Sequence, residues 1–210
     1  MLSTAALLGF CLAVTPLVIT PGASFTLVSA RGMAGDRRGS WAVITGTAAG
    51  VVTHAVLAGV GLAAVVMRSA ELYHLLRLVG AAYLIGLGVT LLWRSRGSTP
   101  LEPKGDTGAP STAMVHLYRA YVANVLNVKA ASVYLTLGPQ FVPAESVGVG
   151  SMLLLAAVHV TVMVAWLGIW STGLAAIASR LSIQTWTRRI DRVGGLLLVA
   201  LGARTAAQSR

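Results

Sequence analysis

The sequence predicts an all-α polytopic membrane protein with six transmembrane helices arranged as two inverted three-helix repeats. Of its 210 residues, 56% are hydrophobic and 10% are charged, against about 25% charged residues in a typical soluble domain. Three runs without charged residues, 2–30, 41–67 and 146–179, each exceed the roughly 20 residues that a helix needs to cross a bilayer. A polar segment at 94–113, rich in Gly, Pro, Ser and Thr, has the composition of a linker between two halves.

The apolar pattern places the six spans at about 4–30, 41–67, 72–93, 118–138, 147–175 and 188–207. The third and sixth are short between flanking arginines, whose side chains reach toward the membrane surface from helix ends. The expected organisation is a first repeat over 1–93, a cytoplasmic linker over 94–117 and a second repeat over 118–210. With three spans in each half, the second repeat must be inverted relative to the first.

Two pairs of glycines support an internal repeat. At a constant offset of 114 residues, Gly80 matches Gly194 and Gly88 matches Gly202 in the third and sixth spans. Chance, together with the general use of small residues where membrane helices pack, is the alternative explanation.

Lysine and arginine residues predict the orientation of the spans. Eleven of them follow the first, third and fifth spans, whereas four lie on the opposite side. Because Lys and Arg are concentrated in cytoplasmic loops, both termini are expected outside the cytoplasm, in a multi-pass protein of the cytoplasmic (inner) membrane. The eleven are Arg31, Arg37, Arg38, Arg94, Arg96, Lys104, Arg119, Arg180, Arg188, Arg189 and Arg192; the four are Arg68, Arg77, Arg204 and Arg210.

Composition also argues against several classes of protein. Cys11 is the single cysteine, so a disulfide, a thiol-disulfide relay and a cysteine-based metal site are not expected. The net charge of +10 comes from basic residues scattered between apolar runs and not from a basic module, which argues against nucleic-acid binding. No cofactor and no metal are expected, and the lipid bilayer is the expected surroundings. The sequence leaves open whether the protein is a homo-oligomer.

The first and fourth spans each contain an interruption near their middle. Thr20-Pro21-Gly22 lies ten residues before Arg31, and Asn127-Val128-Lys129 ends ten residues after Arg119. At 1.5 Å per residue both lie roughly 15 Å from the cytoplasmic edge, near the bilayer midplane. Broken helices at matching positions of two inverted halves are typical of a transporter binding site. The freed backbone groups and a helix N-terminus can hold a carboxylate.

Polar side chains at this depth complete the predicted substrate site, which consists of Thr20, Pro21, Gly22, Asn124, Asn127 and Lys129. Lys129 is the one cation in the middle of a span, where it costs at least about 2.5–3.5 kcal/mol. No Asp or Glu is expected at that depth, so a substrate carboxylate would serve as its counter-ion; a Lys held by backbone carbonyls is the alternative. Asn124 and Asn127 share one helix face, and interhelical hydrogen bonds are the alternative role for them.

His54 and His159 lie within spans and can carry a proton at near-neutral pH, so they are candidates for proton coupling; packing inside the bundle is the alternative. Two other classes of protein stay open. An intramembrane serine protease would need to pair Ser24 or Ser132 with one of these histidines, but the sequence has no Gly-x-Ser-x-Gly elbow. A non-transporting membrane scaffold or chaperone would explain the spans but not the matched interruptions. No catalytic residue is predicted.

The motifs, in their order and spacing, resemble those of the lysine exporter (LysE/RhtB) family of amino-acid efflux proteins. They are "TPGASFTLVSARG", "GDRRG", "GTAAGVVTHAVLAGVGLAA", "LVGAAYLIGLGVTLLWR", "ANVLNVKAASVYLTLGPQFV" and "RVGGLLLVALGARTA". The sequence departs from the family pattern at Ala23 and Val128, where the family usually has proline. The resemblance implies outward transport of amino acids or small relatives, driven by the proton motive force. Because Lys129 disfavours cationic side chains, neutral substrates are expected.

Overall fold

The computed structural model describes residues 2–96, 112–174 and 183–207, and the regular elements within these ranges are helical. The α-helices are α1 (Thr4–Ile19), α2 (Ala23–Met33), α3 (Arg37–Arg68), α4 (Ala70–Arg94), α5 (Ala113–Val125), α6 (Val128–Ser132), α7 (Val149–Ile169) and α9 (Ile183–Ala207). Short π and 3₁₀ segments are η1 (Val133–Leu137), η2 (Gly138–Gln140), η3 (Ala144–Ser146) and η4 (Trp170–Leu174).

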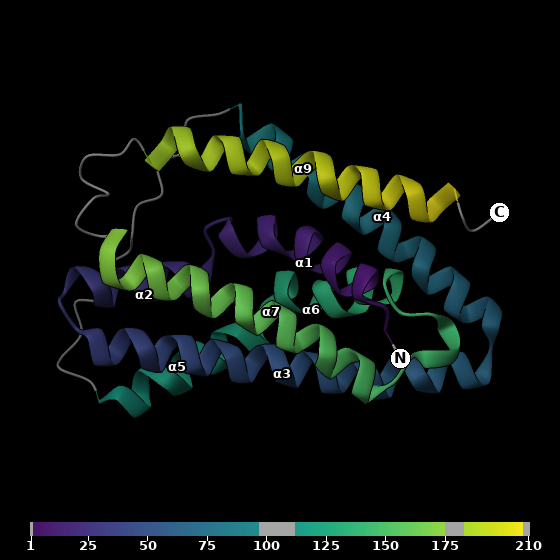
Figure 1. Ribbon diagram of the computed structural model, residues 1–210, viewed down its shortest axis with the longest axis horizontal. Helices are drawn as coiled ribbons and strands as arrows, with labels where there is room; N and C mark the ends of the chain where they lie inside the picture. The colour runs from purple at the N-terminus through teal and green to yellow at the C-terminus, as the bar shows by residue number, and fades with distance from the viewer. Residues whose placement is uncertain (1, 97–111, 175–182, 208–210) are drawn as a thin grey trace.

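The helices form a bundle with two flanks and a central layer (Figure 1). Helices α4 and α9 lie side by side in one flank, while α3, α5 and α7 pack together in the other. Between the flanks lie α1 and the short α6. The start of α1 and the end of α9 lie at the same end of the bundle (Figure 1). One element beside each predicted interruption, α1 at the first and α6 at the second, therefore lies in the central layer.

Capping side chains set the ends of the long helices. Asp36 begins α3 by accepting a hydrogen bond from the Gly39 N–H at 2.7 Å. Ser69 both ends α3 and begins α4, because its side chain accepts from the Leu72 N–H at 3.1 Å. Each cap satisfies a backbone donor that the first helical turn leaves without an intrahelical acceptor.

Three described helical segments, Arg37–Arg68, Glu71–Trp93 and Val149–Gly173, are long and apolar enough to cross a membrane. The bent pair α1 and α2 passes the same test when taken together, which makes up to four such spans within the described ranges. The predicted spans 118–138 and 188–207 are not among them, because α5 ends at Val125 and α9 carries four charged residues over 188–192. The fold is thus an all-helical membrane protein, and the six-span arrangement in two repeats stays a prediction.

Glycines bring α4 and α9 into backbone contact. A Cβ atom on Gly88 would lie 2.7 Å from the Gly195 carbonyl oxygen, and a Cβ atom on Gly195 would lie 2.7 Å from the Gly88 carbonyl oxygen. A Cβ atom on Gly202 would lie 2.7 Å from the Ala81 carbonyl oxygen. Small residues of this kind let membrane helices approach closely, so that van der Waals packing holds them together.

The glycines of the predicted pair Gly80 and Gly194 each pack against an element of the other predicted half. A Cβ atom on Gly80 of α4 would lie 3.1 Å from the Thr136 side chain in η1, whereas one on Gly194 of α9 would lie 2.6 Å from the Pro16 side chain in α1. Each of the two glycines lies in the last helix of its predicted half and meets the first predicted span of the other predicted half.

Candidate functional site

The first helix break lies at the predicted Thr20-Pro21-Gly22. A proline restricts the residue before it to extended conformations, and Thr20 has φ −60° and ψ 121°. Pro21 also has no N–H to continue the helix. The chain resumes as α2 at Ala23, and the axes of α1 and α2 differ by 57°. The predicted interruption of the first span is present.

The second break lies between α5 and α6, although no proline is present there. Asn127 stands at the N-cap of α6 with φ −85° and ψ 107°, and its Oδ1 accepts from the Lys129 N–H at 3.0 Å. Asparagine is a preferred N-cap residue because its side chain satisfies an exposed backbone donor. The Asn127 side chain therefore restarts the helix here, so the break does not depend on the proline that Val128 replaces.

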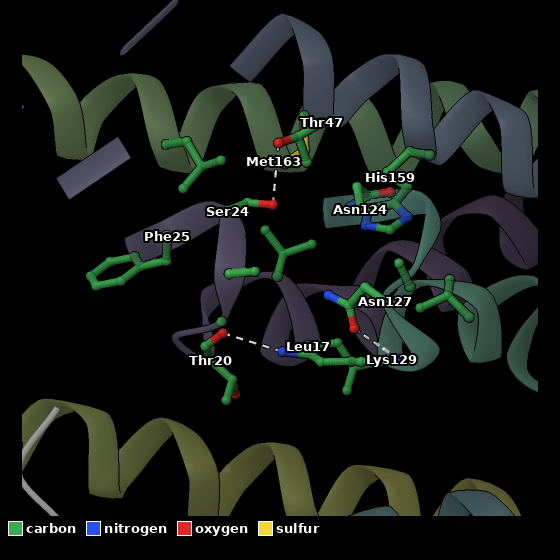
Figure 2. Close-up of a pocket in the computed structure, with 17 residues that line it drawn as sticks. Leu17, Thr20, Ser24, Phe25, Thr47, Asn124, Asn127, Lys129, His159 and Met163 are labelled. Carbon is green, nitrogen blue, oxygen red and sulfur yellow. Dashed lines mark hydrogen bonds between the residues drawn. The ribbon is translucent and has the colours of Figure 1, made fainter. Parts of the chain in front are cut away.

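The two breaks meet at a cavity of about 80 Å³, closed in by α3 and α7 (Figure 2). Five of the six predicted substrate residues line it, together with one of the two predicted histidines: Thr20, Gly22, Asn124, Asn127, Lys129 and His159. Pro21 and His54 are not among the lining residues.

Lys129 reaches across the cavity wall to the first break. Its Nζ donates a hydrogen bond to the Thr20 carbonyl oxygen at 3.2 Å (Figure 2). This carbonyl belongs to the C-cap of α1, where the last carbonyl groups of a helix have no intrahelical donor. The contact joins the two broken segments, and it has the geometry of a Lys held by a backbone carbonyl, the alternative that the sequence left open.

The N-terminus of α2 also opens onto this cavity. Gly22, its N-cap, supplies no side-chain hydrogen bond, so the first-turn N–H groups are not capped from within the chain at that residue. Gly22, Ala23, Ser24 and Phe25 all line the cavity. The positive end of the helix dipole and these N–H groups favour an anion at this position.

Asn124, which also lines the cavity, has a buried acceptor. Its side chain is 5% exposed, and its Oδ1 has no hydrogen-bond partner. Gly50 of α3 makes room for it, because a Cβ atom at Gly50 would lie 2.6 Å from that oxygen. A buried acceptor without a donor costs roughly 1–3 kcal/mol, so a ligand with an N–H or O–H group would remove this cost.

The two histidines are both hydrogen-bonded within the bundle. His159 Nδ1 lies 3.0 Å from the Tyr134 hydroxyl, and His54 Nε2 lies 3.1 Å from the Asn124 carbonyl oxygen. The serines that a protease would use have other partners: Ser24 accepts from the Thr47 hydroxyl, and Ser132 donates to the Lys129 carbonyl oxygen. The hydrogen bonds of these four side chains thus form no Ser–His pair.

Asp191 corrects the expectation that no acid lies near Lys129. It is 4% exposed in α9, and its Oδ1 accepts from the Thr20 hydroxyl at 3.2 Å. Thr20 therefore contacts Asp191 through its side chain and Lys129 through its carbonyl group. The sequence held a usable indication, because Asp191 is the only one of the six acids that falls inside a predicted span.

Two aromatic pairs pack near the cavity. On the α2 side the rings of Phe25 and Trp170 lie 4.7 Å apart, and Trp170 Nε1 donates to the Ser29 hydroxyl at 2.8 Å. On the side of the amino end of α1 the rings of Phe10 and Phe141 meet edge to face at 5.8 Å. Pairs of this geometry contribute about 0.5–1.5 kcal/mol beyond the area that they bury.

Comparison with known proteins places the chain in a family. The family model of the LysE type translocator matches residues 16–209. The homoserine/homoserine lactone efflux protein of Salmonella typhi is 29% identical over 200 residues, which cover 92% of this chain and 92% of that protein. The leucine efflux protein of Enterobacter sp. (strain 638) is 26% identical over 141 residues, 67% of this chain and 65% of that protein.

An uncharacterized membrane protein of Vibrio cholerae serotype O1 is 32% identical over 135 residues, 64% of each chain. No solved structure matches the chain. Because the family model spans nearly its whole length, the protein belongs to the LysE type translocator family, and it is a membrane efflux transporter and not an enzyme.

Proposed function

We propose that the protein exports amino acids or close derivatives across the cytoplasmic membrane, driven by the proton motive force and with a preference for neutral amino acids. The relatives named for efflux of homoserine, homoserine lactone and leucine support this substrate class. Homoserine and leucine both have uncharged side chains. Family membership sets aside the serine protease alternative.

The observation that carries the proposal is the set of complementary groups around one cavity. The uncapped N-terminus of α2 and the Lys129 ammonium favour a carboxylate, while Asn124 Oδ1 is a buried acceptor without a donor. In the proposed pose the substrate carboxylate replaces the Thr20 carbonyl oxygen as a partner of Lys129. The substrate ammonium then donates to Asn124 Oδ1. Thr20, Pro21, Gly22 and Asn127 shape the broken backbone around it.

The neutral preference follows from the lining of the cavity. Apart from Lys129 and His159, the described lining consists of polar uncharged and apolar side chains, among them Val51, Val133 and Met163. A cationic side chain would meet the Lys129 ammonium at close range. The nearby acid, Asp191, does not line the cavity and is bonded to the Thr20 hydroxyl. A hydroxyl or aliphatic side chain meets no such cost.

For proton coupling we propose His159 first and His54 second. His159 lines the cavity and is bonded to Tyr134, whereas His54 touches the backbone of the residue that would hold the ammonium. The support for this order is position: His159 lies at the cavity, whereas His54 lies behind Asn124.

The proposed transporter has six spans in two inverted halves, 1–93 and 118–210, joined by a cytoplasmic segment 94–117, with both termini outside. Two features of the bundle support this arrangement. The start of α1 and the end of α9 lie at the same end of the bundle (Figure 1), and Gly80 and Gly194 each contact the first predicted span of the other half. Helix α5 begins at Ala113, so the last residues of the joining segment are helical. Alternating access would then come from movement of one half against the other.

The test is counterflow in proteoliposomes that contain the purified protein. Labelled L-homoserine and L-leucine should accumulate inside vesicles preloaded with the unlabelled amino acid, whereas labelled L-lysine should not. A protonophore should abolish net uphill transport but leave counterflow intact. Absence of counterflow across all twenty amino acids, with the protein shown to be incorporated, would contradict the proposal and favour the non-transporting scaffold.

A further inference from the structure

A second cavity, of about 370 Å³, adjoins the first at the helix breaks. It lies toward α4, and its own walls are Leu87, Thr90 and Leu91 of α4, Ala123 of α5 and Pro21. The two cavities share six lining residues: Leu17, Thr20, Gly22, Ala23, Asn127 and Lys129. At about 80 Å³ the first is below the roughly 300–1,000 Å³ of typical small-molecule sites, whereas the second is within that range.

The hydrogen bond between Lys129 Nζ and the Thr20 carbonyl oxygen belongs to the wall between the two cavities, since both residues line both of them. Figure 2 shows this bond at the edge of the first cavity. A carboxylate in either cavity can therefore compete for the same ammonium group. Such a charge-assisted bond is stronger than the bond to a neutral carbonyl, so arrival of a carboxylate would open the shared wall.

Two aromatic pairs lie near the first cavity: Phe25, which lines it, contacts Trp170, and Phe10 contacts Phe141. The second cavity lies within two turns of Arg94, the last residue of α4. In the proposed orientation this is the cytoplasmic end of α4, from which an exported substrate arrives.

The walls of the second cavity suit a zwitterion with an uncharged side chain. Among the described residues that line it, Lys129 alone is charged. The Thr90 hydroxyl donates to the Gly86 carbonyl oxygen at 2.8 Å, which leaves its oxygen as an acceptor for a hydroxyl or an ammonium group. Leu87 and Leu91 supply apolar contact for an aliphatic side chain.

We infer that this second cavity is the loading chamber for the substrate amino acid. The substrate enters it from the cytoplasm, its carboxylate displaces the Thr20 carbonyl oxygen from Lys129, and Lys129 carries the carboxylate into the first cavity. The inference rests on the proposed amino-acid export and adds Leu87, Thr90 and Leu91 as residues that contact the substrate.

The test uses single cysteines, for which the chain is well suited because Cys11 is its single native cysteine. In a Cys11→Ser background, Thr90→Cys places a thiol in the chamber with little change in size. Val89→Cys is the matched control, because Val89 is the adjacent residue of α4, is 51% exposed and lines neither cavity. A membrane-impermeant methanethiosulfonate reagent is added to inverted and to right-side-out membrane vesicles.

We expect the reagent to label Thr90→Cys in inverted vesicles and not in right-side-out vesicles. L-homoserine or L-leucine should slow the labelling several-fold, and labelling should abolish efflux. Val89→Cys should show neither substrate protection nor loss of efflux. Leu87→Cys, on the same wall, repeats the measurement if Thr90→Cys has lost transport before labelling.

Two results would contradict the proposal that the second cavity is a loading chamber. Labelling of Thr90→Cys and Leu87→Cys only by membrane-permeant N-ethylmaleimide would mean that lipid occupies the crevice. Labelling by the impermeant reagent without substrate protection and without loss of efflux would mean that water fills it but substrate does not enter. Failure of the wild-type protein to exchange any amino acid in proteoliposomes would instead contradict the proposed function, so the two failures are distinguishable.

Discussion

Asn124 is a buried polar residue whose Oδ1 accepts no hydrogen bond. We predict that Asn124→Leu raises the KM for the exported amino acid by about ten- to a hundredfold, because a hydrogen bond to a charged group contributes roughly 1.5–3 kcal/mol. Membrane abundance should not fall, since the change removes an unsatisfied acceptor.

The measurement is efflux rate against internal substrate concentration, normalised to membrane protein. Thr161→Val serves as a control, because the Thr161 hydroxyl is exposed and bonds only to its own helix at Ala157. A wild-type KM in Asn124→Leu would show that the ammonium is bound elsewhere.

The Thr20–Asp191 contact leads to a second prediction at the scale of single residues. Thr20→Val and Asp191→Ala should each destabilise the protein, and their effects should be coupled by about 0.5–3 kcal/mol because each removes one partner of a shared buried hydrogen bond. The free energy of unfolding in detergent micelles, measured for both single variants and the double variant, gives this coupling. Additive effects would mean that the contact does not stabilise the break.

At the scale of an element, the start of α6 after the second helix break depends on the Asn127 side-chain cap. Asn127→Ala removes the side chain that accepts from the Lys129 N–H, a loss of about 0.5–2 kcal/mol. It lets α5 continue toward α6 and so withdraws Lys129 from Thr20. Efflux should drop sharply in Asn127→Ala and be retained largely in Asn127→Ser, since serine is also a good N-cap. Equal transport by both variants would contradict the role of the cap.

Some elements could be predicted from the sequence and others could not. Long runs without charged residues predicted the positions of α3 and α7, because the membrane requires apolar helices of that length, and a shorter run between arginines predicted α4. The first break could be predicted from Pro21, because its ring and its missing N–H group disrupt a helix whatever the surrounding fold. The contact of Asp191 with Thr20 could not be predicted. The depth of Thr20 in the membrane was inferred for a straight first span, whereas the axes of α1 and α2 differ in direction by 57°. The cavities depend on side chains from several helices and follow from no local pattern.

At the scale of the whole molecule, the inverted arrangement predicts where reporters fused to the chain will be active. A reporter that works only in the cytoplasm should be silent when fused after Arg210 and active when inserted in the 94–113 segment, because most Lys and Arg residues lie on the side of that segment. The reverse activities would contradict the orientation, and with it the proposed direction of loading.

The central claim is that Lys129 binds the substrate carboxylate at the meeting point of the two breaks. The most direct measurement is amino-acid efflux, normalised to membrane protein, for wild type, Lys129→Met and Lys129→Arg. Lys129→Met removes a costly intramembrane charge and should insert normally, yet its efflux should collapse. Lys129→Arg should restore little transport, because a planar guanidinium does not replace a compact ammonium in a cavity of about 80 Å³. Normal export by Lys129→Met, or a loss explained by its absence from the membrane, would contradict the claim and make Lys129 a structural residue.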